Sequence, residues 1–179
     1  MPKIIKDAKE IIVRQARALL SQNGASKLNM RVLAESAGVA AGTLYNYFPS
    51  KEDLIAAVVR DDWEKMLKEV ERRLDLAISA IAGIEMIFNA IAGYREKHGF
   101  LWSTIRASKN FQNKQLDYHK EIIEQIADRI RILGMRFGFL SDPTVAPFIS
   151  EVLFAGGMYP GAQFSFLAPC LKLIVGEKN

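Results

Sequence analysis

The residues that could do chemistry gather in one short stretch, GVAAGTLYNYFPSKEDL, which runs from Gly38 to Leu54. Tyr45 and Tyr47 carry phenolic hydroxyl groups and Lys51 carries an ammonium group, and all three groups can donate hydrogen bonds to phosphate oxygens. The residues directly before them, AAGT, have almost no side-chain bulk. This combination is typical of a surface that lies close against a polyanion.

The distribution of charge supports the same interpretation. The chain has a net charge of +4, and residues 1–51 contain eight basic and three acidic side chains. Residues 52–179 carry a net charge of −1. A basic first third on a near-neutral body predicts a polyanionic partner for that third.

Composition and missing motifs exclude several classes of protein. The 179 residues are 50% hydrophobic and 25% charged, which is typical of a globular chain. The single cysteine forms no internal disulfide and no metal cluster, and the first residues, MPKIIKDAKEII, do not resemble a signal peptide, so we expect a cytoplasmic protein. The sequence has no GxSxG, phosphate loop or metal-spaced histidine pair. We therefore predict no catalytic residue, no metal and no cofactor.

Apolar residues recur at three- and four-residue steps along almost the whole chain, which predicts an all-α fold of about nine helices. The first helix ends near Asn23-Gly24, and Asn29 can cap the second. The further expected helices are residues 41–48, a long helix after Ser50, residues 81–98, 100–108 and 116–137, and two helices on either side of Pro160-Gly161.

The two short helices after Asn29 form a helix-turn-helix pattern around Gly38. Their inward residues make a small core, which consists of Leu33, Ala34, Ala37, Val39, Leu44 and Phe48. The second short helix then presents Ala41, Gly42 and Thr43 on its free face, where small residues allow close approach to base edges in a major groove. The alternative is that Tyr45 and Tyr47 are core aromatics with exposed hydroxyl groups.

These residues carry a resemblance to a known family. The patterns are Ala16-x-x-Leu-Leu-x-x-x-Gly24, Leu33-Ala34-x-x-Ala37-Gly38-Val39 and Gly42-Thr43-Leu44-Tyr45-x-Tyr47-Phe48-x-Ser50-Lys51-x-x-Leu54. With these spacings the region resembles the DNA-binding region of the tetracycline-repressor (TetR) family of bacterial transcription regulators, over about a third of the chain. The resemblance implies a homodimer that binds a palindromic operator and releases it when a small molecule enters the C-terminal domain.

The resemblance also implies which residues contact DNA. Asn29, Gly42, Thr43, Tyr45, Tyr47 and Lys51 fall where contacts are usual in the family. The family often has Ser-Lys where this chain has Ala40-Ala41, so more of the affinity is expected from other cations. The predicted DNA-binding residues are Lys27, Asn29, Arg31, Ala41, Gly42, Thr43, Tyr45, Tyr47 and Lys51.

The implied organisation is a DNA-binding domain at residues 1–49 and an effector-binding and dimerisation domain at residues 50–179. The segment Val152–Leu171 carries no charge and is long enough for a membrane span, but Tyr159-Pro160-Gly161 interrupts it. We expect a helical hairpin covered by a second copy of the chain, with Gly156 and Gly157 allowing close helix approach, and no membrane partner.

A ligand pocket is expected among the middle helices. Its predicted lining is Phe88, Ile91, Trp102, Ile105, Phe111, Tyr118, Ile122 and Phe154, and this aromatic content predicts an apolar or aromatic effector. The alternative for each residue is a place in the ordinary core. An alternative function is a helical carrier of apolar ligands whose basic head binds membrane surfaces, although this would leave the glycine turn and the paired tyrosines unexplained.

Overall fold

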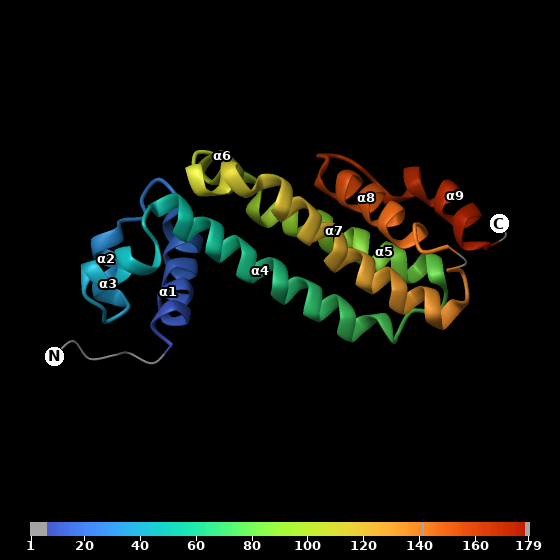
Figure 1. Ribbon diagram of the computed structural model, residues 1–179, viewed down its shortest axis with the longest axis horizontal. Helices are drawn as coiled ribbons and strands as arrows, with labels where there is room; N and C mark the ends of the chain where they lie inside the picture. Colours follow the sequence, from blue (N-terminus) through green and yellow to red (C-terminus); the bar gives the residue numbers. More distant parts are fainter. Residues whose placement is uncertain (1–6, 141, 178–179) are drawn as a thin grey trace. The chain divides into compact units, whose positions relative to one another are not determined.

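The computed structural model describes residues 7–140 and 142–177, which form helices joined by short links (Figure 1). This part of the chain contains nine α-helices, one 3-10 helix and no strand, so the prediction of an all-α fold is confirmed. The elements are α1 (Ala8–Asn23), α2 (Met30–Ser36), α3 (Ala41–Tyr47), α4 (Lys51–Leu74), α5 (Ala80–His98), η1 (Gly99–Leu101), α6 (Trp102–Arg106), α7 (Lys109–Phe137), α8 (Val145–Met158) and α9 (Phe164–Val175).

The chain forms two compact units. The first contains the described residues up to Asp62 together with Phe100–Lys114, and the second contains Trp63–Gly99 and the residues from Gln115 onward. Helices α4 and α7 therefore each begin in the first unit and continue in the second. The expected division into a DNA-binding part at residues 1–49 and an effector part at residues 50–179 concerns function and stays a prediction.

The first unit is built around the small core expected from the sequence. Leu33, Leu44 and Phe48 are buried, and Val39 between the two short helices is buried as well. Gly38 has a φ of 66°, a left-handed conformation in which a side chain would be strained, so it can turn the chain sharply between α2 and α3. The prediction of a helix-turn-helix held by these apolar residues is confirmed.

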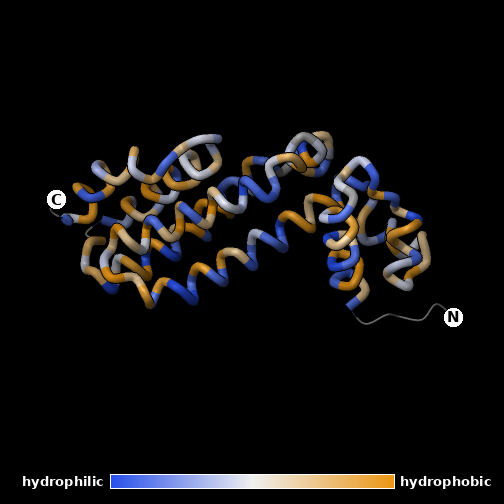
Figure 2. Tube along the Cα trace, turned by 180° about the vertical axis from the view of Figure 1, so that it is seen from behind, coloured by the Kyte–Doolittle hydropathy of each residue, from blue (hydrophilic) through white to orange (hydrophobic). Residues whose placement is uncertain are grey.

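Helix α4 buries apolar residues in both units, because its amphipathic pattern runs along its whole length. Along it, hydrophilic and hydrophobic residues follow one another in short alternating stretches, as an amphipathic helix requires (Figure 2). Leu54, Ile55 and Val58 are buried in the first unit, while Trp63 and Leu67 are buried in the second. Helical periodicity therefore continues through the boundary between the units.

The second unit packs α8 and α9 against α5. A Cβ atom at Gly157 would lie 2.6 Å from Cγ2 of Ile91 on α5, and one at Gly156 would lie 2.9 Å from Cδ1 of Leu167 on α9. Both glycines thus allow close packing inside one subunit. The expectation that they serve the contact between subunits is wrong, because the backbone of α8 turns them toward its own neighbours.

The chain between α8 and α9 makes the expected turn. The N–H group of Ala162 donates to the carbonyl oxygen of Tyr159 at 3.2 Å, and Gly161 has a φ of 82°. Within the two described ranges, no helix is long and apolar enough to cross a membrane. The apolar segment is therefore a helical hairpin.

Two further details differ from the sequence prediction. The helix expected at 100–108 consists of η1 and the short α6, because Ser108 serves as the cap of α7. The helix expected at 116–137 begins earlier, at Lys109, and Leu116 within it is exposed, whereas Ile123, Ile126, Ile130 and Leu133 are buried.

Candidate DNA-binding surface

The first turn of α3 presents only small side chains on its exposed surface. Ala41 and Gly42 are exposed and Thr43 is half-buried. Gly42 has ordinary helical geometry, and a Cβ atom added to it would meet nothing within 4 Å. The fold therefore does not require glycine at this position, although glycine destabilises a helix by about 1 kcal/mol relative to alanine.

The two tyrosines of α3 point away from the core. Each has a relative exposure of 46%, whereas Leu44 and Phe48 on the opposite face are buried. The alternative that these tyrosines are core aromatics with only their hydroxyl groups exposed is therefore wrong. Both phenol groups extend from the same helix as Gly42 and Thr43.

The start of α2 supplies a second group of polar residues. The side-chain oxygen of Asn29 accepts hydrogen bonds from the backbone N–H groups of Arg31 at 2.9 Å and Val32 at 3.4 Å. This confirms Asn29 as the helix cap, a role that uses its side-chain oxygen and not its NH₂ group. Lys27 and Arg31 on either side are exposed.

Lys51 lies in the first turn of α4, three residues beyond Phe48. Its Nζ atom donates to the carbonyl oxygen of Ser26 at 3.3 Å, which ties α4 to the link between α1 and α2. An ammonium group has three donors, so this bond leaves two for another acceptor. No pattern in the sequence indicates this tether, because the two residues lie 25 positions apart.

Arg17 is a cation that the charge count included but that is already neutralised. Its Nε atom donates to Oδ1 of Asp62 at 2.6 Å, and its Nη2 atom bonds the carboxylate of Asp61. These bonds fasten α1 to α4 within the first unit. The basic charge available to a partner therefore comes from other residues, including Lys27, Arg31 and Lys51.

The eight residues predicted to line a ligand pocket are divided between the two units. In the first unit, the rings of Trp102 and Phe111 lie 6.5 Å apart and Ile105 is buried. In the second unit, Phe88 and Ile91 are buried in α5, and the remaining three are half-buried residues of α7 and α8, namely Tyr118, Ile122 and Phe154.

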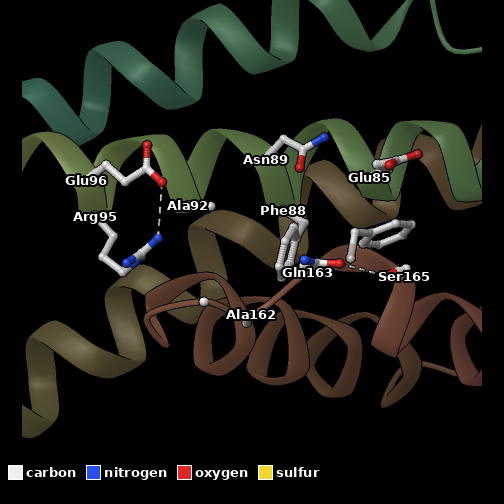
Figure 3. Close-up of a pocket in the computed structure, with 11 residues that line it drawn as sticks. Glu85, Phe88, Asn89, Ala92, Arg95, Glu96, Ala162, Gln163 and Ser165 are labelled. Carbon is white, nitrogen blue, oxygen red and sulfur yellow. Dashed lines mark hydrogen bonds and ion pairs between the residues drawn. The ribbon is translucent and has the colours of Figure 1, made fainter.

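A groove of about 470 Å³ opens in the second unit between α5 and the start of α9 (Figure 3). Of the eight predicted pocket residues only Phe88 borders it, and its ring lies 5.6 Å from that of Phe164. Arg95 is held there by a bond from Nε to the carbonyl oxygen of Gly157 at 3.1 Å. The other polar lining residues are Glu85, Asn89, Glu96, Gln163 and Ser165.

The first unit thus has the architecture of helix-turn-helix DNA-binding proteins. Helix α3, the second helix of the motif, is exposed and carries the hydroxyl groups of Tyr45 and Tyr47, and the cation Lys51 follows it. Residues 12–58 match the model of the family described as bacterial regulatory proteins, tetR family. The helix-turn-helix region of the chain is therefore that of this family.

Relatives and solved structures agree with the assignment. The chain is 27% identical over 124 residues to the nucleoid occlusion factor SlmA of Vibrio campbellii, an alignment that covers 68% of this chain and 63% of the relative. It thus spans somewhat less than two thirds of that relative's length. It is 25% identical over 174 residues to the HTH-type transcriptional regulator UidR of Escherichia coli K12, covering 82% and 87% of the two chains.

Among solved structures, the fold is similar to Thermus thermophilus FadR, a TetR-family transcriptional repressor in complex with lauroyl-CoA. The TM-score is 0.62, the identity is 18%, and the alignment covers 94% of this chain and 91% of the other. At this identity the likeness concerns the fold, and it extends over both units.

Proposed function

We propose that the protein is a homodimeric transcriptional repressor that binds a palindromic operator through α3 and acts in the cytoplasm. The observation that carries this proposal is the exposed first turn of α3. Glycine is a poor helix former, and no residue that the structure describes lies within 4 Å of a Cβ atom added to Gly42. Glycine at this position is explained if α3 must approach DNA base edges closely, because a larger side chain would block that approach.

The DNA contacts divide into two kinds. Ala41, Gly42 and Thr43 lie at base edges and determine sequence preference. The other residues bind phosphates and fix the register of the protein on the duplex. These phosphate-binding residues are Lys27, Asn29, Arg31, Tyr45, Tyr47 and Lys51.

The second copy of the chain covers α8 and α9. The exposed side chains of these helices include Phe148, Phe166 and Leu173, the last with a relative exposure of 82%, and Tyr159 in the link between them is exposed as well. Large apolar side chains concentrated on two adjacent helices favour a subunit interface over a solvated surface. A two-fold dimer would present two copies of α3 to two half-sites of one operator.

A small apolar or aromatic molecule is the proposed effector, bound in the helical body near Phe88. The groove beside Phe88 and Phe164 lies at this place, with polar side chains along its other walls, and Thermus thermophilus FadR, which has a similar fold, is in complex with lauroyl-CoA. The protein releases the operator if the effector binds the DNA-free conformation more tightly than the DNA-bound one. Linkage then requires that saturating operator weakens effector binding by the same factor.

The test begins with a duplex that the protein itself selects from a random pool. Binding isotherms for this duplex, a scrambled duplex and anionic vesicles are then measured at several salt concentrations. A specific regulator binds the selected duplex much more tightly than the scrambled one at physiological salt. Equal affinity for both duplexes, or binding to vesicles alone, would contradict the proposed function, and vesicle binding would favour a carrier of apolar ligands.

A further inference from the structure

One hydrogen-bonded cluster joins the helix-turn-helix to a segment far along the chain. Ser108 is buried, with a relative exposure of 4%, and its hydroxyl donates to Oδ1 of Asp53 at 2.8 Å. The same hydroxyl oxygen accepts from the backbone N–H of Phe111 at 3.2 Å and so caps α7. Ser108 and Asp53 are 55 residues apart but belong to the same unit.

The other carboxylate oxygen of Asp53 serves the start of α4. Ser50 donates its hydroxyl to Oδ2 of Asp53 at 2.7 Å, and its Oγ atom accepts from the backbone N–H of Asp53 at 3.1 Å. One carboxylate therefore binds the capping serines of both α4 and α7. The first turns of these two long helices are held together at a single side chain.

This joint lies next to the recognition helix. Only Phe48, Pro49 and Ser50 separate the end of α3 from the start of α4, and Phe48 is buried in the small core. Lys51, directly after Ser50, is tethered to the link before α2. A change in the direction of the first turn of α4 would therefore move both α3 and Lys51.

The segment Phe100–Lys114 is also held together by its own contacts. Gln112 donates through Nε2 to the carbonyl oxygen of Arg106 at 2.7 Å, and Trp102 packs near Phe111. Leu101 and Ile105 are buried. The segment can therefore act as a rigid support and is more than a connecting loop.

We propose that Phe100–Lys114 completes the DNA-binding unit and that Ser108 is a positioning residue for operator binding, acting through Asp53. This segment lies outside residues 12–58, the region that the family model matches. The proposal rests on the proposed function, because it assigns Ser108 a role in setting the geometry of the α3 surface. Ser108 itself contacts no DNA.

The experiment compares Ser108→Ala with a matched control, Ser79→Ala. Ser79 caps α5 by accepting from the backbone N–H of Ala82 at 3.3 Å, and it belongs to the second unit. Both variants lose the hydroxyl of a helix cap. The measurements are thermal unfolding, and binding of the selected duplex at several salt concentrations in full-length protein well below the unfolding temperature.

We expect Ser108→Ala to weaken operator binding about threefold to tenfold, as expected when a binding surface is less well preorganised. The slope of affinity against salt should be unchanged, because no phosphate contact is removed. Ser79→Ala should bind the operator like the wild type. Ser108→Thr, which keeps the hydroxyl group, should restore affinity if it folds.

Two results would separate the possible failures. Absence of specific DNA binding in the wild type would overturn the proposed function and this inference with it. Wild-type affinity in a Ser108→Ala protein of lowered thermal stability would overturn the positioning role alone. If Ser108→Ala does not fold, Asp53→Asn decides the question, because it replaces one of the two oxygens that accept from Ser50 and Ser108 with an NH₂ group and so breaks the joint between the two serines. It must also bind the operator more weakly, and unchanged affinity would overturn the inference.

Discussion

The Nζ atom of Lys51 lies 3.3 Å from the backbone carbonyl oxygen of Ser26, so one lysine links the first turn of α4 to the chain between α1 and α2. The same ammonium group keeps two donors for a phosphate oxygen. A structural role and a DNA-binding role are therefore combined in one side chain, and they predict different measurable effects.

Lys51→Ala should weaken binding to the selected and scrambled duplexes about equally, because phosphate contacts carry no sequence information. The slope of log affinity against log salt should fall by about 0.9, the contribution of one phosphate contact. Loss of the bond to Ser26 should reduce the unfolding free energy by at most about 1 kcal/mol. Binding isotherms and chemical denaturation measure the two effects.

The control for this prediction is Lys68→Ala. Lys68 is an exposed lysine of the same helix in the second unit, so the variant changes net charge equally. Its salt slope should stay that of the wild type. An unchanged slope in Lys51→Ala would show that Lys51 does not contact phosphate, and its role would then be limited to the bond with Ser26.

The proposed subunit interface predicts that charge on α9 prevents dimer formation. Leu173→Glu places a carboxylate on a side chain with 82% relative exposure, where the free subunit tolerates it but an apolar interface does not. Burial of a leucine is worth about 1.5–3 kcal/mol, so the change should lower the dimerisation affinity at least tenfold. Sedimentation velocity over a range of concentrations measures the shift to monomer.

Leu76→Glu is the matched control, since Leu76 is also exposed, at 71%, but lies in the link between α4 and α5. It should sediment like the wild type. Gly156 is less suitable as a test, because a side chain there would collide with Leu167 of its own subunit. A Leu173→Glu protein that stays dimeric at micromolar concentration would exclude this face of α9.

The sequence was sufficient to predict elements that depend on near neighbours. The inward positions of Leu33, Leu44 and Phe48 follow from helical spacing, and the cap at Asn29 follows from its position before an apolar run. Such features are local, since each is determined by residues within two turns of a helix.

Long-range pairings could not be predicted in this way. Arg17 lies 45 residues from Asp62, and Ser108 lies 55 residues from Asp53, so no periodicity in the sequence relates them. The direction in which Gly156 faces depends on how α8 packs against α5 and α9, and an apolar helix alone does not determine it. The candidate surface was therefore predicted, but the bonds that position it were not.

Acid should remove one stabilising contact before α8. Hydrogen bonds from the hydroxyl and then the backbone N–H of Thr144 lower the pKa of Asp142 below its ordinary value of 3.8. A depressed folded-state pKa contributes stability that is complete above the unfolded value and is lost as the pH falls through the folded value. The difference in unfolding free energy between wild type and Asp142→Asn should therefore be constant from pH 7 to 5 and change below about pH 4. A difference that stays constant down to pH 2 would contradict this.

The last prediction concerns Gly42, where stability and DNA binding should change in opposite directions. A side chain at this exposed helical position meets nothing within 4 Å, and leucine favours a helix by almost 1 kcal/mol over glycine. Gly42→Leu should therefore unfold at the same or a higher denaturant concentration than the wild type. The leucine side chain should nevertheless hold α3 away from the base edges and abolish preference for the selected duplex.

Gly93→Leu is the control, because Gly93 is likewise exposed in a helix, α5, with nothing within 4 Å of an added Cβ. It should gain similar stability and keep full operator binding. Denaturation curves and isotherms on both duplexes test the pair, and a Gly42→Leu protein that still distinguishes the selected from the scrambled duplex would show that α3 does not read the bases through its first turn.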